Sequence, residues 1–305
     1  MDKVYNGVFP IAPTPFDDRG SIDLESQKRV LDCMIDQGVD GLCILANYSE
    51  QFLLSDEERT QLLTLCMEHV AGRVPVIVTC SHFSTDIAAD RARSAAEHGA
   101  DMIMMMPPYH GALLKAGPKG IIEHFEKVAA ASNIKIMVQD APLSGVDMPI
   151  ELLVNLATKV PGLSYFKIET PQTADKLRAL IQAGGDAIVG PFDGEESITL
   201  MADLNAGAKG TMPSALLPDL IKPIITKYTD NNLKEAEAAY AKILPIINFE
   251  NRQCGLRACK ALMREGGVIA SEYVRHPLPP LAPETRAQLL ELARPLNPVA
   301  LTWGH

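Results

Sequence analysis

Lys167 stands inside a short run of apolar and aromatic residues, LSYFKIE at 163–169, with Glu169 two positions later. The run follows Pro161-Gly162, which is typical of a turn, and it predicts a buried strand. A buried ammonium group is costly unless a partner or a chemical role compensates for the loss of water. The run is therefore either an edge strand with its lysine in solvent or a central strand whose lysine has chemistry to perform.

An inward lysine among apolar residues has its charged form disfavoured, so its pKa falls and the neutral amine can act as a nucleophile. Strand alternation places Tyr165, Lys167 and Glu169 on one face and Phe166 and Ile168 on the other. The structural alternative is a buried ion pair between Lys167 and Glu169.

The elements that must position this lysine form a repeating pattern. Helical stretches end at a glycine and lead into apolar runs in QGVDGLCILAN, EHGADMIMMMP and NAGAKGTMPS, which is typical of a left-handed helix end followed by a buried strand. The predicted strands lie within 8–14, 37–47, 74–80, 97–107, 134–140, 163–169, 187–193 and 205–214.

Helical periodicity separates these strands, and Ser55-Asp-Glu-Glu58 forms a capping box that opens one of the helices. Eight buried strands alternating with helices predict an α/β protein, a (β/α)8 TIM barrel. We assign residues 1–222 to the barrel and 223–305 to a C-terminal helical extension packed on it as one structural unit. A doubly wound sheet is the alternative, but no GxGxxG follows the first strand.

Composition narrows the class of protein. The 305 residues carry a net charge of -10, which disfavours nucleic acid and anionic membranes as partners. The six cysteines contain no CxxC pair and predict reduced thiols, and the N-terminus lacks a secretory signal, so we expect a cytoplasmic location. The seven histidines contain no HxH or HxxxH pair, so we expect no metal. A small-molecule enzyme is the leading class.

The whole chain, from GVFPIAPTPFDDRGSID to NRQCGLRACKALM, resembles the class I lyases grouped around dihydrodipicolinate synthase and N-acetylneuraminate lyase. Lys167 in YFKIE matches the lysine that forms a Schiff base with a 2-keto acid. The resemblance implies a barrel with C-terminal helices, a homotetramer, and no cofactor apart from the covalent Schiff base on Lys167.

The segments LANYSEQF, MMPPYHG, VQDAP, YFKIETP, GPFDGEE and ALMREGGVIASE are similar to the L-2-keto-3-deoxyarabonate dehydratase branch of that family. The family tyrosine of YNxP, which shuttles protons, is missing from VQDAP. Gln139 or Val138 takes its place, depending on the alignment. The GTTGE loop that holds the substrate carboxylate is matched by 46–50, and the arginine that synthases use for a second carboxylate is absent from APLSG.

The resemblance implies a hydro-lyase that converts 2-keto-3-deoxy-L-arabonate to 2-oxoglutarate semialdehyde and water in pentose sugar-acid catabolism. Loss of the tyrosine favours dehydration over retro-aldol cleavage. The alternatives are an aldolase that releases pyruvate, a 5-keto-4-deoxyglucarate dehydratase, and a ligand-sensing or structural barrel without activity.

Seven further residues are candidates for the site, each with a structural alternative. Tyr109 matches a family tyrosine that reaches the neighbouring subunit's site, or it packs at an interface. Gln139 could orient a water or a hydroxyl group. We expect Asn47, Tyr48 and Ser49 to hold the substrate carboxylate unless they only form a turn. Tyr48 and Tyr109 are also candidates to replace the missing phenol.

Two of the seven follow later strands. Asp193 and Ser214, together with Glu195 or Glu196, are candidates for contacts with distal hydroxyl groups, or they belong to solvated loops. His82, after the third strand, is either a proton relay or a hydrogen-bonded loop residue.

Overall fold

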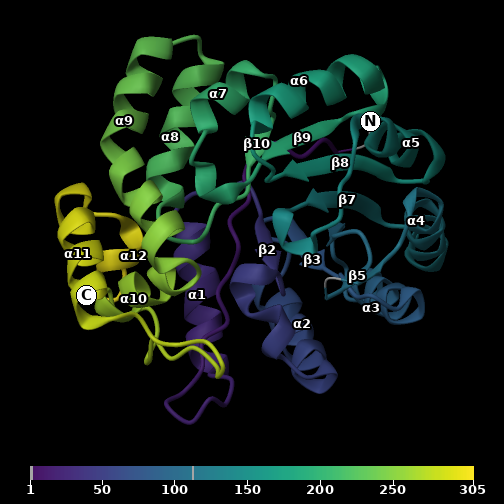
Figure 1. Ribbon diagram of the computed structural model, residues 1–305. Helices are drawn as coiled ribbons and strands as arrows, with labels where there is room; N and C mark the ends of the chain where they lie inside the picture. The colour runs from purple at the N-terminus through teal and green to yellow at the C-terminus, as the bar shows by residue number, and fades with distance from the viewer. Residues whose placement is uncertain (1–2, 112) are drawn as a thin grey trace. The chain divides into compact units, whose positions relative to one another are not determined.

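The computed structural model describes residues 3–111 and 113–305 (Figure 1). The chain divides into two compact units. The first contains the chain up to Asn6, Val76–Gly194 and Thr199–Thr211. The second contains Gly7–Pro75, Glu195–Ile198 and Met212–His305. Each unit is described by itself.

The first unit is built on parallel strands in the order β10-β9-β8-β7-β4-β3. Their bounds are β3 (Val76–Thr79), β4 (Met102–Met105), β7 (Lys135–Asp140), β8 (Leu163–Ile168), β9 (Gly190–Asp193) and β10 (Gly210–Thr211). Strands β3, β4 and β9 are buried at every residue, as expected for a parallel sheet covered by other elements.

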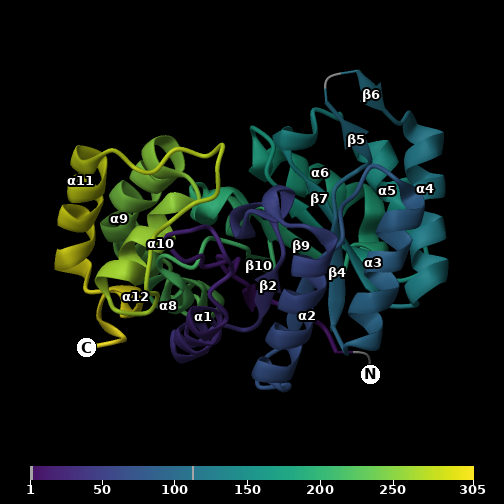
Figure 2. The same ribbon diagram turned by 90° about the horizontal axis from the view of Figure 1, so that it is seen from below.

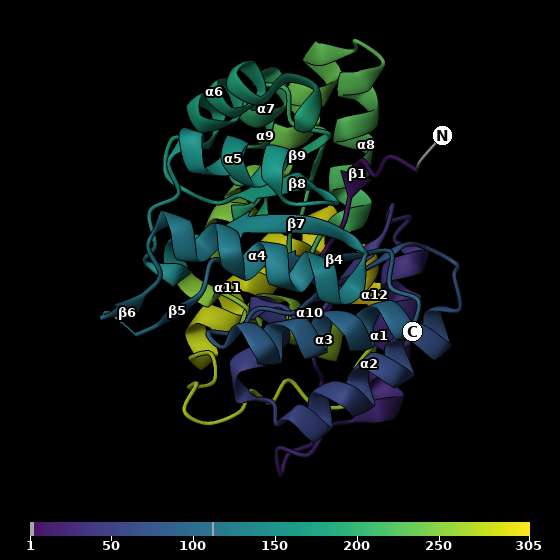
Figure 3. The same cartoon turned by 90° about the vertical axis from the view of Figure 1, so that its right-hand side faces the viewer.

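Helices follow these strands and pack side by side in chain order, with α4 and α5 in front of β7 and β8 in Figure 3. They are α3 (Thr85–Glu97), α4 (Pro118–Ser132), α5 (Ile150–Lys159), α6 (Thr173–Gly184) and α7 (Leu200–Asn205). A short antiparallel hairpin, β5 (Tyr109–His110) and β6 (Leu114–Lys115), interrupts the connection between β4 and α4.

The second unit holds β1 (Gly7–Val8), β2 (Leu42–Ile44) and most of the remaining helices. Isolated parallel bridges join Ile11 to Cys43 and to Ser214. The helices are α1 (Leu24–Asp36), α2 (Asp56–Val70), α8 (Pro218–Thr229), α9 (Leu233–Phe249), α10 (Arg257–Glu265), α11 (Pro283–Ala293) and α12 (Val299–Thr302). Helices α8–α12 gather in one group in Figure 2.

Within the described residues, eight strands are each followed by a helix, from β1-α1 to β10-α8, which confirms the predicted (β/α)8 class. Seven of the eight predicted strand segments contain a strand, whereas β1 begins one residue before the segment 8–14 and shares only Val8 with it. Helices α5 and α6 coincide with IELLVNLATK and TADKLRALIQAG, whose apolar residues recur at helical spacing. Gly38, Gly99 and Gly207 have φ of 76°, 82° and 102°, so the predicted left-handed helix ends are confirmed.

The capping box is also present: Ser55 Oγ accepts a hydrogen bond from Glu58 N, and the Glu58 carboxylate accepts one from Ser55 N. The predicted boundary at residues 222 and 223 falls inside α8, and the division into barrel and extension stays a prediction. In the part of the chain that the structure describes, every helix is too short or too polar to cross a membrane.

Candidate active site

Lys167 lies near the C-terminal end of β8, an interior strand of the first unit. It is in register with Gln139 on β7 and with Phe192 on β9. The edge-strand interpretation is therefore wrong, and the residue is only 5% exposed. The strand begins after Gly162, whose φ of 78° lets the chain turn from α5 into the sheet.

Glu169 holds the lysine directly. Its Oε1 lies 2.5 Å from Lys167 Nζ, and the two side chains are 6% and 14% exposed. Gln139 Nε2 donates a hydrogen bond of 3.0 Å to the same Glu169 oxygen. The structure thus joins an amine, a carboxylate and an amide on two neighbouring strands, with the carboxylate at the centre.

Gly194 allows the chain to pass close to this group. A Cβ atom at Gly194 would lie 2.4 Å from Glu169 Cγ and 3.1 Å from Lys167 Cε, and both distances are too short or very tight for a carbon contact. A side chain here would displace the lysine or its partner, so the position favours glycine for steric reasons. This constraint cannot be read from the GPFDGEE segment alone.

Asp193 ends β9 in register with Ile168, not with Lys167, which places it with the face opposite the lysine. It is 1% exposed, accepts a hydrogen bond from the Thr211 hydroxyl and is hydrogen bonded to Asp203. Burial raises the pKa of Asp193 well above its usual value, and Asp203 raises it further. The raised pKa favours the protonated form of Asp193. A substrate contact by Asp193 stays a prediction.

Tyr109 lies on the β5–β6 hairpin and is partly buried, and this burial raises the pKa of its phenol. The adjacent His110 packs its ring 6.0 Å from that of Phe83, centroid to centroid. The proposed contact with a neighbouring subunit stays a prediction. His82 Nδ1 accepts a hydrogen bond of 2.9 Å from Ser84 N, as a loop histidine would.

In the second unit, Asn47–Ser49 form one 3-10 turn, which begins after the two residues that follow β2. Ser49 Oγ donates to the Ala12 carbonyl at 2.6 Å and accepts from Ala46 N at 3.1 Å. Asn47 Oδ1 accepts a hydrogen bond of 2.6 Å from Gln51 Nε2. The turn is therefore rigidly built, and its side chains take part in building it.

Tyr48 is hydrogen bonded to Glu196. Burial raises the pKa of Tyr48, and the charge of Glu196 raises it further, so the phenol remains protonated. Asn251 Nδ2 also donates to Glu196, at 2.8 Å. The structure thus favours Tyr48 as a hydrogen-bond donor over its predicted alternative role as the substitute base.

The sequence did not predict a role for Glu250 beside Tyr48 and Glu196. It is 2% exposed, it is hydrogen bonded to Ser214, and its pKa is raised well above the usual value by burial and then by Glu196. Its position in a helical segment gave no sign of a role.

The backbone of the neighbouring residues Glu195, Glu196 and Ser197 is strained, since all three have positive φ, of 50°, 57° and 68°. Strained residues of this kind are frequent at functional sites.

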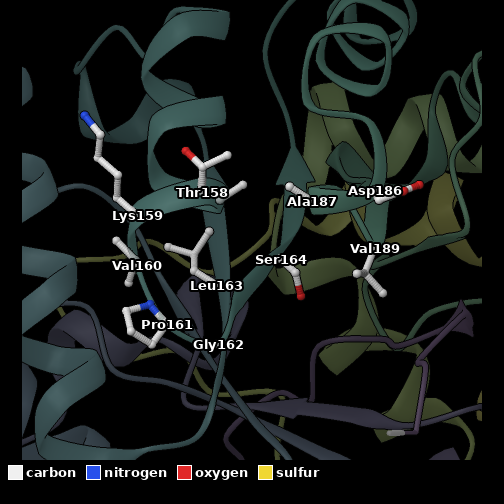
Figure 4. Close-up of a pocket in the computed structure, with 11 residues that line it drawn as sticks. Thr158, Lys159, Val160, Pro161, Gly162, Leu163, Ser164, Asp186, Ala187 and Val189 are labelled. Atoms are coloured by element: carbon white, nitrogen blue, oxygen red, sulfur yellow. The ribbon is translucent and has the colours of Figure 1, made fainter. Parts of the chain in front are cut away.

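The first unit has a pocket of about 390 Å³ that does not include Lys167. Its lining includes Leu163 and Ser164 at the start of β8, whereas Lys167 lies near the end of that strand (Figure 4). None of the predicted site residues lines it. Among the residues whose positions are described, no group of three histidine, cysteine or acidic side chains is arranged to hold a metal.

The family follows from the comparison with known proteins. Residues 4–295 match the model of the dihydrodipicolinate synthetase family. The chain belongs to this family. It is 54% identical to an L-2-keto-3-deoxyarabonate dehydratase of Azospirillum brasilense over 301 residues, which cover 99% of this chain and 97% of that protein.

More distant relatives carry a different activity name. A 4-hydroxy-tetrahydrodipicolinate synthase of Bacillus subtilis is 26% identical, covering 90% of this chain and 94% of that protein. A crystal structure from Pseudomonas aeruginosa, described as a dihydrodipicolinate synthetase, has a TM-score of 0.89 at 28% identity, covering 95% of this chain and 99% of that one. The chain is thus a lyase of this family with the (β/α)8 fold, and it is about twice as identical to the dehydratase as to these synthases.

Proposed function

We propose that this enzyme converts L-2-keto-3-deoxyarabonate to 2-oxoglutarate semialdehyde and water through a Schiff base on Lys167, without a further cofactor. The observation that carries the proposal is the buried group of Lys167, Glu169 and Gln139 in a chain 54% identical to a named dehydratase. A carboxylate in contact with an amine can take the proton that the amine must lose before it attacks a ketone.

In the first stage, the ammonium of Lys167 passes a proton to Glu169, and the amine adds to C2 of the substrate. The resulting carbinolamine loses its oxygen as water, and that oxygen carries away the proton that Glu169 received. The product is an iminium that draws electrons from C3 and makes its protons acidic.

In the second stage, Glu169 removes a proton from C3 to give an enamine. The enamine expels the C4 hydroxyl as water, with the same proton, and leaves an unsaturated iminium between C2, C3 and C4. Loss of a proton from C5 and its return to C3 move the double bond to C4–C5 as an enol. The enol becomes the aldehyde, and water releases the 2-keto group from Lys167, so one water is lost overall.

Gln139 supports this path because its amide group fixes the carboxylate that moves the protons. An amide is a poor base, so we assign Gln139 to orientation. Tyr109 stays a candidate for the site of a neighbouring subunit, as part of a proposed homotetramer. In the second unit, we assign the carboxylate of the substrate to the Asn47–Ser49 turn and a distal hydroxyl group to Ser214. A contact between a distal hydroxyl group and Asp193, which lies in the first unit, stays a prediction.

The same proposal places the enzyme in the cytoplasm, in the catabolism of L-arabinose. The buried thiols of its six cysteines support a reducing compartment. Two other activities use the same lysine: an aldolase would release pyruvate, and a 5-keto-4-deoxyglucarate dehydratase would need a cationic contact for a second carboxylate.

The test is borohydride reduction in the presence of L-2-keto-3-deoxyarabonate, with peptide mapping and product analysis. We expect a reduced adduct on Lys167, semialdehyde as product and no pyruvate. Lys167→Met should abolish the adduct, whereas Lys159→Met, on the exposed side of α5, should leave it unchanged. Pyruvate as the main product would make the enzyme an aldolase, and no adduct with any 2-keto acid would overturn the mechanism.

A further inference from the structure

Lys260, on α10 of the second unit, is a charged residue with no exposed side-chain surface. Its ammonium group forms an ion pair with Glu50, which is equally buried. It also donates a hydrogen bond of 2.9 Å to the Tyr273 carbonyl and lies 4.5 Å from the centroid of the Phe16 ring. Burial lowers the pKa of Lys260, and the charge of Glu50 opposes that change.

A second cation completes the surroundings of Glu50. The Arg275 backbone N donates 2.9 Å to Glu50 Oε2, so both carboxylate oxygens have a partner. The Arg275 guanidinium group lies 4.4 Å from the centroid of the Phe16 ring. It also donates a hydrogen bond of 2.8 Å to the Leu53 carbonyl and forms an ion pair with Glu58. Two cations and two carboxylates thus form a neutral network around one loop.

Glu50 lies between the two turns of that loop. It ends the turn Asn47–Ser49 and begins the turn Gln51–Leu53, with φ of 57° in the left-handed region that a residue with a side chain rarely adopts. Its N donates to the Asn47 carbonyl at 3.1 Å, and its own carbonyl accepts from Leu53 N at 2.9 Å. A strained backbone of this kind persists only when its surroundings hold it, and the buried ion pair is such a restraint.

The charges themselves call for a reason beyond stability, because an apolar pair of similar size is often as stable as a buried ion pair. Without Lys260, the Glu50 carboxylate would stand uncompensated beside the turn to which we assign the substrate carboxylate. Lys260 neutralises Glu50 and at the same time fixes the residue that ends the turn.

We propose that Lys260 is a positioning residue for substrate binding: through Glu50 it holds the Asn47–Ser49 turn in the geometry that receives the carboxylate of the 2-keto acid. This inference rests on the proposed function. A purely structural role predicts only a loss of stability. A positioning role predicts that KM rises even in a variant that is fully folded.

The test uses the neutral double variant Glu50→Gln/Lys260→Met, which leaves neither charge unpaired, together with the single variant Glu50→Gln. Thermal unfolding is measured first, then kcat and KM with L-2-keto-3-deoxyarabonate, and borohydride trapping at saturating substrate. The matched control is Glu272→Gln/Arg286→Met, an ion pair formed within the C-terminal segment.

We expect both Glu50 variants to fold, to form the Lys167 adduct at saturation, and to keep kcat within about threefold of wild type while KM rises at least tenfold. The control should leave KM unchanged. A folded Glu50 variant with wild-type KM would overturn the inference alone, since wild-type enzyme would still form the adduct. If wild-type enzyme forms no adduct on Lys167, the proposed function fails, and the inference fails with it.

Discussion

Replacing Glu169 by glutamine separates its chemistry from its packing. Glutamine has the same shape, so it still fits beside Gly194 and can bond to Gln139, but it cannot accept a proton from C3. A positioned acid–base group contributes roughly 10²- to 10⁴-fold to a rate. We therefore expect kcat of Glu169→Gln to fall by that factor, which is about 2.7–5.4 kcal/mol in the activation barrier.

The assay is semialdehyde formation at saturating substrate, paired with borohydride trapping over minutes. The variant should form the adduct on Lys167 more slowly than wild type, because Glu169 also takes the proton of Lys167. The adduct should still accumulate, because an ammonium can lose its proton to water, whereas removal of the C3 proton needs a positioned base. Glu151→Gln, on the exposed start of α5 in the same unit, is the control and should keep wild-type kcat. If Glu169→Gln retains more than a tenth of wild-type kcat, the base is another group and the mechanism above is wrong.

Three further predictions follow from the same geometry. Gly194→Ala should lower kcat at least tenfold in steady-state assays, because its methyl group would overlap the Glu169 side chain. Asp193 has a raised pKa, so the folded state binds more protons than the unfolded state and stability falls as pH rises above about 4. Urea unfolding at pH 5 and pH 8 measures how much the free energy of unfolding falls between these two pH values. The fall should be smaller for Asp203→Asn than for wild type, by about 1.4 kcal/mol for each unit by which Asp203 raises the pKa of Asp193. Tyr48→Phe should raise KM but keep kcat within about tenfold if the phenol is a donor, and a loss of 100-fold would make it the base instead.

Most of the fold could be predicted from local patterns in the sequence. The helices α5 and α6 and the left-handed glycines were predictable because periodicity, capping and glycine conformation depend on neighbours along the chain. The bounds of the strands were less predictable: β1 has two residues within its unit, although the apolar run that predicts it extends to position 14. Apolar content marks a buried segment, whereas strand bounds depend on which backbone groups find partners.

The site was predictable only where strand geometry decides it. Lys167 and Glu169 share a face through simple alternation, but the face of Asp193 depends on its register with β8, which no local pattern records. The pairing of Glu50 with Lys260 joins positions 210 residues apart, and in the sequence Lys260 is an ordinary helical lysine. Such contacts depend on tertiary packing and could not be found by spacing.

The position of the carboxylate also bears on the choice between dehydration and cleavage. Glu169 directly follows the strand that carries Lys167, and its oxygen lies 2.5 Å from Nζ, the atom that the proposed mechanism bonds to C2. C3 is attached directly to C2, whereas the C4 hydroxyl lies two bonds beyond C3. A base held this close to the lysine is better placed to remove the C3 proton than the hydroxyl proton that retro-aldol cleavage requires. In the proposed mechanism, a base at Glu169, directly after β8, replaces the family tyrosine expected on β7, and its position favours loss of water over cleavage.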